Sequence, residues 1–557
     1  MKRSTKTNSN KRNDPCIVNT LNTPFLVIVE SPSKCAKIEK YLGFQYKCIA
    51  SKGHVRELKK VGSAKQQYAP SYDIISEKAE HVTWMRSIVS QFPPQNVFLG
   101  TDDDREGEAI AWHICVLCNL DPSTTKRILF HEVTAPALRS AVAVPSTLRM
   151  SIVRAQQARQ ILDRMIGFQI SPVLSRLLVH DNAKFLSAGR CQTPTLRLVY
   201  ERYKQCETKK DRVVHKIEST FFSHPSTLNA LLTNTLDTEE DVQQFLENSQ
   251  THEHHVMLPA CKEKRKLAPK PFSTSALLQA ASAHLSMSPK YVMDGCQKLY
   301  QDGYITYMRT ESQKYAESFV SQCKEYIQNH YGADVVGDVS AITNQDNQNP
   351  HEAIRVTQLS VKGTQYNDRK INDLYELVWK RTMESCMRCY VYQEQVVRIS
   401  SPLDKSVYEA IIEIPLSLGW KRLTMTVTEL QELQQRSSAS VAYYKRYDHK
   451  VIPYQKIVSK MHQKDRDIYY QEAGLIQKLE TLGIGRPSTF SMLVETIQER
   501  QYVKKEDILG ESYMGNEYTL ENDEISAIQS TKTFGGAKNK LCIQPLGVQA
   551  IEWLVEH

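Results

Sequence analysis

The sequence has no long apolar run. Nowhere in its 557 residues does a stretch approach the roughly 18 consecutive apolar side chains that a bilayer-spanning helix needs. The N-terminus also lacks the apolar core of a secretion signal. We therefore expect a soluble, intracellular protein with no membrane partner.

Cysteine occurs without the spacing of a disulfide framework. The 13 cysteines are an odd number and are scattered, which is typical of a protein kept in a reducing compartment. Two Cys-x-x-Cys pairs, Cys115 with Cys118 and Cys386 with Cys389, lie far apart and within helical patterns. We interpret them as buried thiols and expect no zinc site.

A phosphate-binding loop of the GxxxxGK[ST] type is missing, so we expect no use of ATP. A strong excess of one charge is missing too. The 62 acidic residues offset most of the 71 basic ones and leave a net charge of +9. This balance permits an anionic partner, but any basic binding surface must be local.

Length and composition favour a multidomain globular protein. A chain of 557 residues with 41% hydrophobic content can bury several separate cores. Residues 1–23 are polar and basic and predict a disordered tail.

A tyrosine and an arginine, Tyr307 and Arg309, stand two residues apart in DGYITYMRTES, residues 302–312. In an extended segment, side chains with this spacing point to the same face and would meet one anionic target. A tyrosine hydroxyl can attack a phosphodiester and keep the strand attached, while a guanidinium offsets charge on the phosphorus oxygens. In most such pairs the tyrosine only packs against its neighbours and the arginine only carries a solvated charge. Other motifs must therefore support this interpretation.

Two strand-to-helix patterns precede the tyrosine. PFLVIVE at residues 24–30 and NVFLG at residues 96–100 predict buried strands, each followed by a helix. After the second strand, Asp102, Asp104 and Glu106 alternate, so in an extended segment their carboxylates converge at the sheet edge where ligands bind. Converging carboxylates favour a divalent cation, and oxygen ligands suit Mg²⁺. The alternative is an exposed acidic helix start.

Together these motifs resemble the type IA DNA topoisomerases. GYITYMRTES resembles the active-site segment of the family, and TDDDREGE resembles its Toprim metal motif, with Glu30 supplied by the first strand. Further segments resemble family motifs in the expected order, between Pro24 and Val503: SKGHVREL, ILFHEVT (residues 128–134, the last Toprim strand), VRAQQARQILDR, FLSAGRCQT, NPHEAIRVT and GIGRPST.

The resemblance implies roles for individual residues. Tyr307 would be the nucleophile, Arg309 would stabilise charge, and Glu30 or Lys34 would transfer protons. His351 would contact the scissile phosphate, four residues before Arg355 on one helical face. The implied Mg²⁺ ligands are Glu30, Asp102, Asp104 and Glu106. The implied DNA-binding residues are His54, Arg159, Asp163, Ser187, Ala188, Gly189, Arg190, Cys191, Gln192, Gln297, Arg355, Arg486, Ser488 and Thr489.

The implied fold is a multidomain α/β protein with further α and β parts in a toroidal type IA topoisomerase architecture. After the tail, the expected domains are a Rossmann-like Toprim domain (24–146), a helical base (147–207), a β-rich arch (208–266), a helical gate with the tyrosine (267–393), the returning arch (394–467) and the second part of the base (468–557). We expect a monomer located wherever the DNA is, in the cytoplasm and nucleoid or in a nucleus.

The implied activity is ATP-independent relaxation of negatively supercoiled DNA. One strand would be cut through a 5′-phosphotyrosine, the other strand passed, and the break rejoined. A topoisomerase III-like decatenase, a Toprim nuclease or primase, and a non-catalytic DNA-binding scaffold remain open as alternatives. The sequence departs from the family at Gln301, where many relatives have glutamate, and at Val356, the usual proline of HEAIRP; we also expect no C-terminal zinc ribbons.

Overall fold

The computed structural model describes residues 22–178, 186–208, 212–223, 227–344, 351–464 and 469–556. The predicted disordered tail therefore lies outside the described residues, apart from its last two positions. The chain divides into two compact units. Unit 1 consists of Met1–Arg190, Met293–Thr310 and Val356–Tyr375, and unit 2 consists of Cys191–Val292, Glu311–Arg355 and Glu376–His557.

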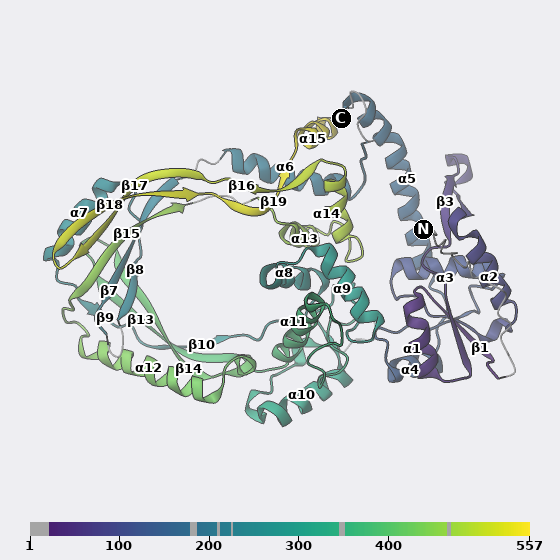
Figure 1. Cartoon of the computed structure of the whole chain (residues 1–557), viewed down its shortest axis with the longest axis horizontal. Helices are drawn as coiled ribbons and strands as arrows, with labels where there is room; N and C mark the ends of the chain where they lie inside the picture. The colour runs from purple at the N-terminus through teal and green to yellow at the C-terminus, as the bar shows by residue number, and fades with distance from the viewer. Residues whose placement is uncertain are drawn as a thin grey trace, which may run out of the picture. The chain divides into compact units, whose positions relative to one another are not determined.

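Unit 1 contains a four-stranded parallel sheet of order β2-β1-β5-β6, of which Figure 1 labels β1. Its strands are β1 (Phe25–Val29), β2 (Tyr46–Ala50), β5 (Val97–Leu99) and β6 (Lys126–Arg127). The two strands predicted from PFLVIVE and NVFLG are thus confirmed as β1 and β5. The prediction of a strand over residues 128–134 is wrong. The neighbouring strand β5 ends at Leu99, whose carbonyl accepts from the Ile128 N–H, so the residues after Ile128 have no backbone partner on β5.

Several helices also belong to unit 1. They are α1 (Pro32–Leu42), α2 (Ala79–Val89), α3 (Arg105–Cys118), α4 (Ala135–Ala143) and α5 (Met150–Leu178), and a hairpin of β3 (Arg56–Val61) and β4 (Pro70–Ile74) accompanies them. The core joins apolar side chains of β1 and β5 with those of α2 and α3, among them Leu26, Leu99, Met85 and Ile110. The long helix predicted from residue 151 is confirmed as α5.

Later stretches of chain complete unit 1. Most of α9 (Pro289–Gln301) belongs to it, and the tyrosine segment follows. Ile305 forms an antiparallel bridge with Val356, and Thr357 N–H donates to the carbonyl of Tyr304. Residues 356–375 therefore hold the tyrosine segment from one side.

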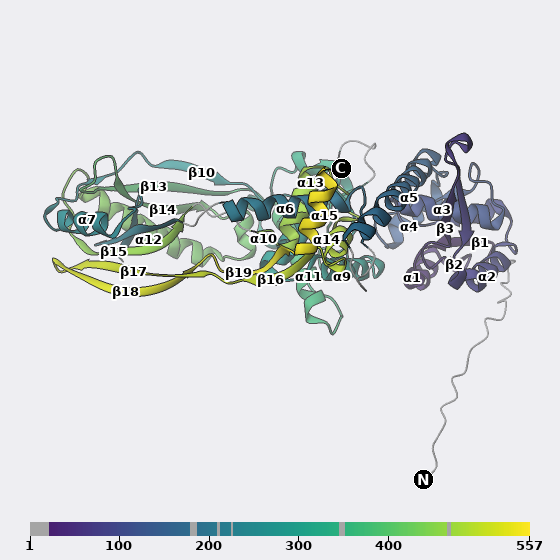
Figure 2. The ribbon, with the colours of Figure 1, turned by 90° about the horizontal axis from the view of Figure 1, so that it is seen from above.

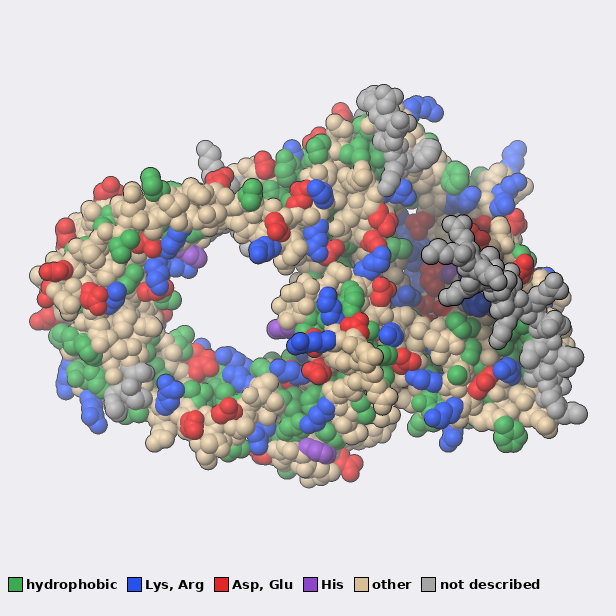
Figure 3. All heavy atoms as spheres, in the orientation of Figure 1, with side chains coloured by type: hydrophobic (Ala, Val, Ile, Leu, Met, Phe, Trp, Pro, Cys, Tyr) green, Lys and Arg blue, Asp and Glu red, His purple; other side chains and the backbone are tan. Residues whose placement is uncertain are grey.

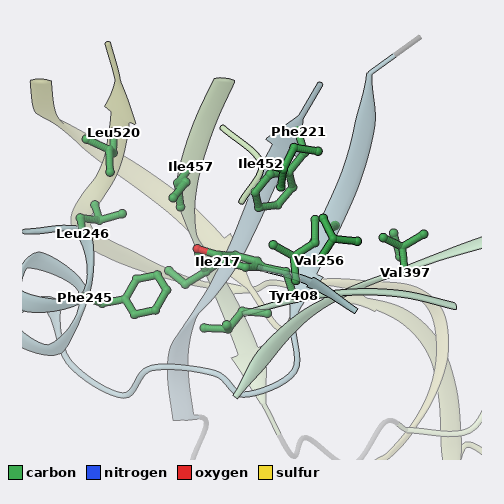
Figure 4. Packing of buried hydrophobic residues seen from close by; sticks show 14 of the residues in the cluster. Ile217, Phe221, Phe245, Leu246, Val256, Val397, Tyr408, Ile452, Ile457 and Leu520 are labelled. Carbon is green, nitrogen blue, oxygen red and sulfur yellow. The ribbon is translucent and has the colours of Figure 1, made fainter. Parts of the chain in front are cut away.

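Unit 2 is built on a curled nine-stranded sheet of order β10-β13-β14-β8-β7-β15-β17-β18, with β9 beside β13. The strands are β7 (Arg212–Phe221), β8 (Leu228–Leu232), β9 (Val256–Met257), β10 (Lys262–Lys266), β13 (Tyr390–Ser400), β14 (Val407–Ser417), β15 (Tyr454–Lys464), β17 (Glu511–Glu521) and β18 (Glu524–Phe534). Its buried face is apolar, and Figure 4 shows Phe221, Phe245 and Tyr408 packed together with Ile217 and Leu520.

The expectation of a helical segment over residues 468–557 is wrong in its middle part. Four strands lie there: β17, β18 and the pair of β16 (Val503–Ile508) with β19 (Ala537–Ile543). Figure 2 shows β17 and β18 as a long hairpin. Its turn residues Asn522 and Asp523 both have positive φ, 52° and 61°, as a two-residue hairpin turn of type I′ requires.

Unit 2 also contains further helices and short strands. They are α6 (Gln192–Thr208), α7 (Glu239–Thr251), α8 (Thr274–Leu285), α10 (Glu317–Tyr331), α11 (Arg369–Ser385, from Glu376 on), α12 (Val427–Arg446), α13 (Glu472–Thr481), α14 (Phe490–Glu499), α15 (Pro545–Glu556) and the short strands β11 (Tyr315–Ala316) and β12 (Thr343–Asn344). Helix α12 runs along β14 within the range assigned to the returning β-rich arch (Figures 1 and 2). Among the described residues, no helix is both long and apolar enough to cross a membrane.

Candidate active site

The carboxyl ends of two neighbouring parallel strands bring acidic residues together in unit 1. Glu30 follows β1, and Asp102 to Asp104 follow β5, which pairs with β1 in register Ile28 to Leu99. The side chain of Glu30 accepts a hydrogen bond from the backbone N–H of Asp102 at 2.9 Å. The predicted sheet-edge site is therefore present, with both strands contributing.

Glu30 has an unusual protonation equilibrium. Burial and the nearby charges of Asp102 and Asp104 raise the pKa of this carboxyl to about 7, against an ordinary 4.5. The ammonium of Lys34 and the bond from Asp102 N–H act in the opposite direction but do not outweigh them. Near neutral pH, Glu30 can therefore either hold or release a proton.

The turn after β5 depends on a glycine. Asp104 is the N-cap of α3 and accepts a hydrogen bond from the backbone N–H of Gly107 at 2.8 Å. A Cβ atom at Gly107 would lie 2.1 Å from the carbonyl oxygen of Asp102. The acidic segment can therefore take this path only because residue 107 has no side chain.

Lys34 and Tyr300 form a buried pair behind the carboxylates. The Lys34 ammonium contacts Asp102 Oδ1 and lies 4.5 Å from the centre of the Tyr300 ring. Tyr300 is fully buried, and within the described part of the chain its hydroxyl has no hydrogen-bond partner. The ring of Tyr300 in turn meets the ring of Tyr307 edge to face, with 5.2 Å between centroids. Sequence analysis did not single out Tyr300.

Tyr307 and Arg309 converge on one oxygen atom. The Tyr307 hydroxyl donates to Asp104 Oδ2 at 2.6 Å, and Nη1 of Arg309 lies 3.3 Å from the same atom. The shared target that their spacing predicted is thus an acidic side chain in this structure. Burial and the charges of Asp104 and Asp102 raise the pKa of Tyr307 well above its ordinary value, so the phenol is protonated here.

A network beneath this site was missed by the sequence analysis. His131 Nε2 lies 3.0 Å from Asp103 Oδ2, and the guanidinium of Arg149 contacts the other oxygen of Asp103. Burial alone would raise the pKa of Asp103, but the bonds from His131 and Arg149 hold it well below its usual range. The His131 carbonyl accepts the backbone N–H of Tyr307 at 2.8 Å, so this network helps to hold the tyrosine segment.

Two contacts join α1 to the end of α9. The Ser33 hydroxyl donates to Oε1 of Gln301 at 2.8 Å, and Lys37 pairs with Asp302 at 3.0 Å. Gln301, which departs from the family pattern, thus has a neutral hydrogen-bond partner on α1.

Glu106 is not part of the carboxylate group. Helix α3 begins at Arg105, so the extended alternation ends before Glu106, and the prediction that all three carboxylates converge is wrong for this residue. Its oxygens instead face Gln156 at 2.9 Å, His54 at 3.3 Å and Arg159 at 3.5 Å. Burial alone would raise the pKa of Glu106, but these partners lower it.

Other predicted DNA-binding residues of unit 1 lie along α5 and the turn before α6. Asp163 accepts from Nε of Arg190 at 3.2 Å and also pairs with Arg159 at 3.7 Å. Ala188 N–H donates to the hydroxyl of Ser171 at 3.1 Å, which fixes the turn containing Ser187 and Gly189. Gln297 is half-buried on α9.

Several predicted site residues belong to unit 2. Cys191 and Gln192 lie at the start of α6. The helix expected to carry His351 and Arg355 is absent: residues 351–355 are irregular, because Ala353 N–H bonds to the Lys314 carbonyl rather than within a helical turn. Arg355 is buried, pairs with Glu352 at 2.8 Å and lies 3.9 Å from the Phe319 ring centre.

The GIGRPST turn precedes α14 in unit 2, as predicted. Thr489 Oγ1 accepts from the backbone N–H of Arg486 at 3.0 Å, and Gly483 and Gly485 both have positive φ. Arg486 is exposed, and its Nη1 donates to the Gly485 carbonyl at 2.9 Å; Ser488 is half-buried.

Two lysines lie side by side on the sheet of unit 2: Lys216 of β7 and Lys460 of β15 are cross-strand neighbours. Figure 3 shows basic and acidic side chains mixed on the face that it draws. Some of this charge is neutralised locally, since Lys460 contacts Glu218 and Lys456 lies 3.2 Å from Glu521.

Comparison with known proteins agrees with this fold. Residues 25–133 match the model of the Toprim domain, and residues 147–519 match the model of the DNA topoisomerase family. Among solved structures, the chain is similar to full-length topoisomerase I from Thermotoga maritima, with 28% identity and a TM-score of 0.71 over 86% of this chain and 79% of that one.

A chain that combines a Toprim domain with the DNA topoisomerase family region is an isomerase that acts on DNA. The chain belongs to the type IA DNA topoisomerases. The resemblance drawn from the sequence motifs is thereby confirmed, as is the expected fold class of a multidomain α/β protein with further α and β parts and a Toprim domain.

Proposed function

We propose that the protein relaxes negatively supercoiled DNA without ATP, by transient cleavage of one strand through a 5′-phosphotyrosine on Tyr307. The observation that carries this proposal is the convergence of the Tyr307 hydroxyl and the Arg309 guanidinium on Asp104 Oδ2. A nucleophile, a charge-stabilising fork and a proton acceptor are thereby grouped around one atom. Bond energy kept in the phosphotyrosine makes a nucleotide unnecessary for rejoining.

Each proton has a donor and an acceptor in this scheme. The Tyr307 oxygen attacks phosphorus, and its proton passes to Asp104, which already accepts that hydrogen bond. Before a metal ion binds, the departing 3′-oxygen takes a proton from Glu30, whose pKa of about 7 leaves it partly protonated near neutral pH. The Lys34 ammonium contacts Asp102 beside them. Rejoining reverses these transfers.

The donor set fits Mg²⁺. Glu30, Asp102 and Asp104 offer only oxygen ligands, and their mutual repulsion, seen in the raised pKa of Glu30, is what a divalent cation would relieve. When bound there, the ion would align the 3′-hydroxyl for rejoining. We leave Glu106 out of this set, because its oxygens already face Gln156, His54 and Arg159.

Single-stranded DNA would reach this site along basic and polar side chains. In unit 1 the exposed guanidinium of Arg190 and the half-buried Arg159 suit phosphate contacts, and in unit 2 the exposed Arg486 does. The gate, arch and base assignments are part of this proposal, except that residues 503–543 are strands rather than a helical part of the base. A monomeric state is part of it too.

The test uses negatively supercoiled plasmid with Mg²⁺ and no ATP. Wild type should relax the plasmid stepwise and leave protein on 5′ ends when the reaction is stopped with detergent. Tyr307→Phe should do neither, whereas Tyr304→Phe, a nearby tyrosine variant, should keep both activities. Relaxation by Tyr307→Phe would refute the proposal.

Each alternative function predicts a different result in these assays. Nicking that survives Tyr307→Phe would indicate a Toprim nuclease. DNA binding without scission would indicate a scaffold. Poor relaxation combined with efficient unlinking of catenated, single-stranded circles would indicate a decatenase. Such an enzyme uses the same tyrosine chemistry but prefers a different substrate.

A further inference from the structure

A cavity of about 660 Å³ lies in unit 2, and none of the predicted site residues is among the described residues that line it. Its walls include the end of β7, the stretch from Val451 to Lys456 that leads into β15, and the turn between β17 and β18. Sites for small molecules usually have volumes of roughly 300 to 1,000 Å³. The cavity is therefore large enough for a small organic ligand.

A bulge in β15 shapes one wall of the cavity. Gln455 is an extra residue there, since the residues before and after it pair with two consecutive residues of β7. A bulge bends its strand and redirects side chains, and bulges are frequent beside functional sites. Here Tyr454, Gln455 and Lys456 all line the cavity, although the alternation of a regular strand would turn one of them away.

The walls are anchored in the rest of unit 2. Ile452 is buried and belongs to the core cluster of the curled sheet, in which Figure 4 also labels Phe221. Tyr454 packs against the same cluster. At the hairpin turn, the backbone carbonyl of Asp523 accepts a hydrogen bond from Nε2 of Gln250 in α7 at 2.7 Å. These contacts form the site before a ligand arrives, which reduces the entropy cost of binding.

Apolar and aromatic side chains are exposed at the cavity. Phe222 and Val451 are each 43% exposed, and Pro453 is exposed as well. The half-buried Tyr454 adds a second aromatic ring, and its hydroxyl donates to Asp523 Oδ1 at 2.8 Å. A ligand with a flat apolar body would remove these side chains from water.

The charges at the cavity favour a cation. Lys456 Nζ lies 3.2 Å from Glu521 Oε2, so these two charges offset each other. Asp523 has no cationic partner within the described part of the chain, and the hydrogen bond that its carboxylate accepts comes from a neutral hydroxyl. Burial lowers the pKa of His252 and of His254, so neither imidazole supplies a positive charge near neutral pH. An anion such as a nucleotide would therefore be repelled.

We propose that this cavity binds a small organic cation, in which an ammonium group is attached to a flat apolar body. The ammonium pairs with the Asp523 carboxylate through charge-assisted hydrogen bonds. The body lies against Phe222 and Tyr454, whose ring faces also attract a cation. This proposal stands apart from the proposed function, because none of its residues takes part in strand cleavage.

The first test compares probes with nearly the same body but different charge: 2-phenylethylammonium, 2-phenylethanol and 3-phenylpropanoate. Each is titrated into the full chain without metal or DNA, and binding is measured by calorimetry and by saturation-transfer NMR. We expect a dissociation constant on the order of 1 mM or lower for the cation, binding at least about fivefold weaker for the alcohol, and none for the anion. Equal binding of all three would mean that only apolar contact matters and would overturn the proposal.

The second test removes the charge of Asp523 with little change of shape. Residue 523 has a φ of 61°, which asparagine tolerates as aspartate does, so Asp523→Asn should keep the hairpin turn. Its affinity for 2-phenylethylammonium should fall at least about tenfold, because a charge-assisted bond is lost.

Glu524→Gln is the matched control. Glu524 is exposed in the same hairpin but is not among the described residues that line the cavity, so the affinity should stay unchanged. If Asp523→Asn binds the cation as tightly as wild type, or if both variants weaken binding equally, the cation follows general surface charge and the proposal is wrong.

Hydrogen exchange locates the bound probe. With 2-phenylethylammonium, the amides of residues 452–457 and 520–524 should exchange more slowly, while those of β10 in the same unit should not change. Slower exchange confined to other segments would place the probe elsewhere and would also overturn the proposal.

Discussion

Replacing Glu30 with glutamine should stabilise the metal-free protein above neutral pH. The carboxyl is buried beside Asp102 and Asp104, and its pKa is raised from 4.5 to about 7. Below the ordinary value the group is protonated in both folded and unfolded chains, so it contributes no difference. As pH rises past 4.5, the unfolded chain releases this proton while the folded chain keeps it, and folding stability falls until pH reaches about 7.

The size of this effect follows from the shift. A change of about 2.5 pKa units, from 4.5 to about 7, corresponds to about 3 kcal/mol at roughly 1.4 kcal/mol per unit. Glu30→Gln keeps the shape of the side chain but never ionises, so it avoids this loss. We therefore expect the variant to exceed wild type by up to about 3 kcal/mol at about pH 8, and by almost nothing at about pH 4.

Hydrogen exchange of the β1 and β5 amides, followed by mass spectrometry across a urea series, measures stability at this site. Glu57→Gln is the matched control, because Glu57 is exposed in the same unit. Saturating Mg²⁺ should reduce or reverse the difference, since the ion would bind and stabilise wild type more than the variant. Equal stability of wild type and variant at about pH 8 without metal would refute the assigned role of burial and carboxylate repulsion.

Substitutions at three further positions test the geometry around the tyrosine. Arg309→Lys keeps the charge but loses the planar fork, so single-turnover cleavage by Tyr307 should fall roughly 10- to 100-fold, and unchanged cleavage would argue against a direct role. Tyr300→Phe should change the cleavage rate by no more than about twofold and should not lower stability, because the hydroxyl that it removes has no partner among the described residues. Tyr300→Ala should instead lower the free energy of unfolding, measured with denaturant, by about 3 kcal/mol or more. Gly107→Ala should abolish measurable cleavage, since its Cβ would lie 2.1 Å from the Asp102 carbonyl; a normal rate in a plasmid assay would show that the turn can adjust.

Local spacing predicted the parts of the site that lie within one short segment. Tyr307 and Arg309 do reach a common atom, and the strands that end at Glu30 and Asp102 do lie side by side. Glu106 was assigned wrongly because an i, i+2 pattern holds only while the chain stays extended, and α3 begins one residue earlier.

Contacts between segments that are far apart in the chain leave no comparable spacing pattern in the sequence. Asp103 was passed over because it falls between the alternating positions, yet its partners His131 and Arg149 lie far along the chain. His351 was placed on a helix because its spacing from Arg355 fits one, but backbone pairing with Lys314 and Phe272 determines the local structure. The Asn522–Asp523 turn was a local signal for a hairpin that the analysis did not use.

Unit 1 is built from three separate stretches of the chain, which affects when it can fold during protein synthesis. The tyrosine segment is held by the bridge between Ile305 and Val356, and the unit is complete only at Tyr375. A ribosome-bound chain will have exposed its Toprim sheet long before the stretch that supports the nucleophile has emerged. The carboxylates and the tyrosine therefore come together late, so an unfinished chain contains all the proposed reacting residues of unit 1 without the support that aligns them.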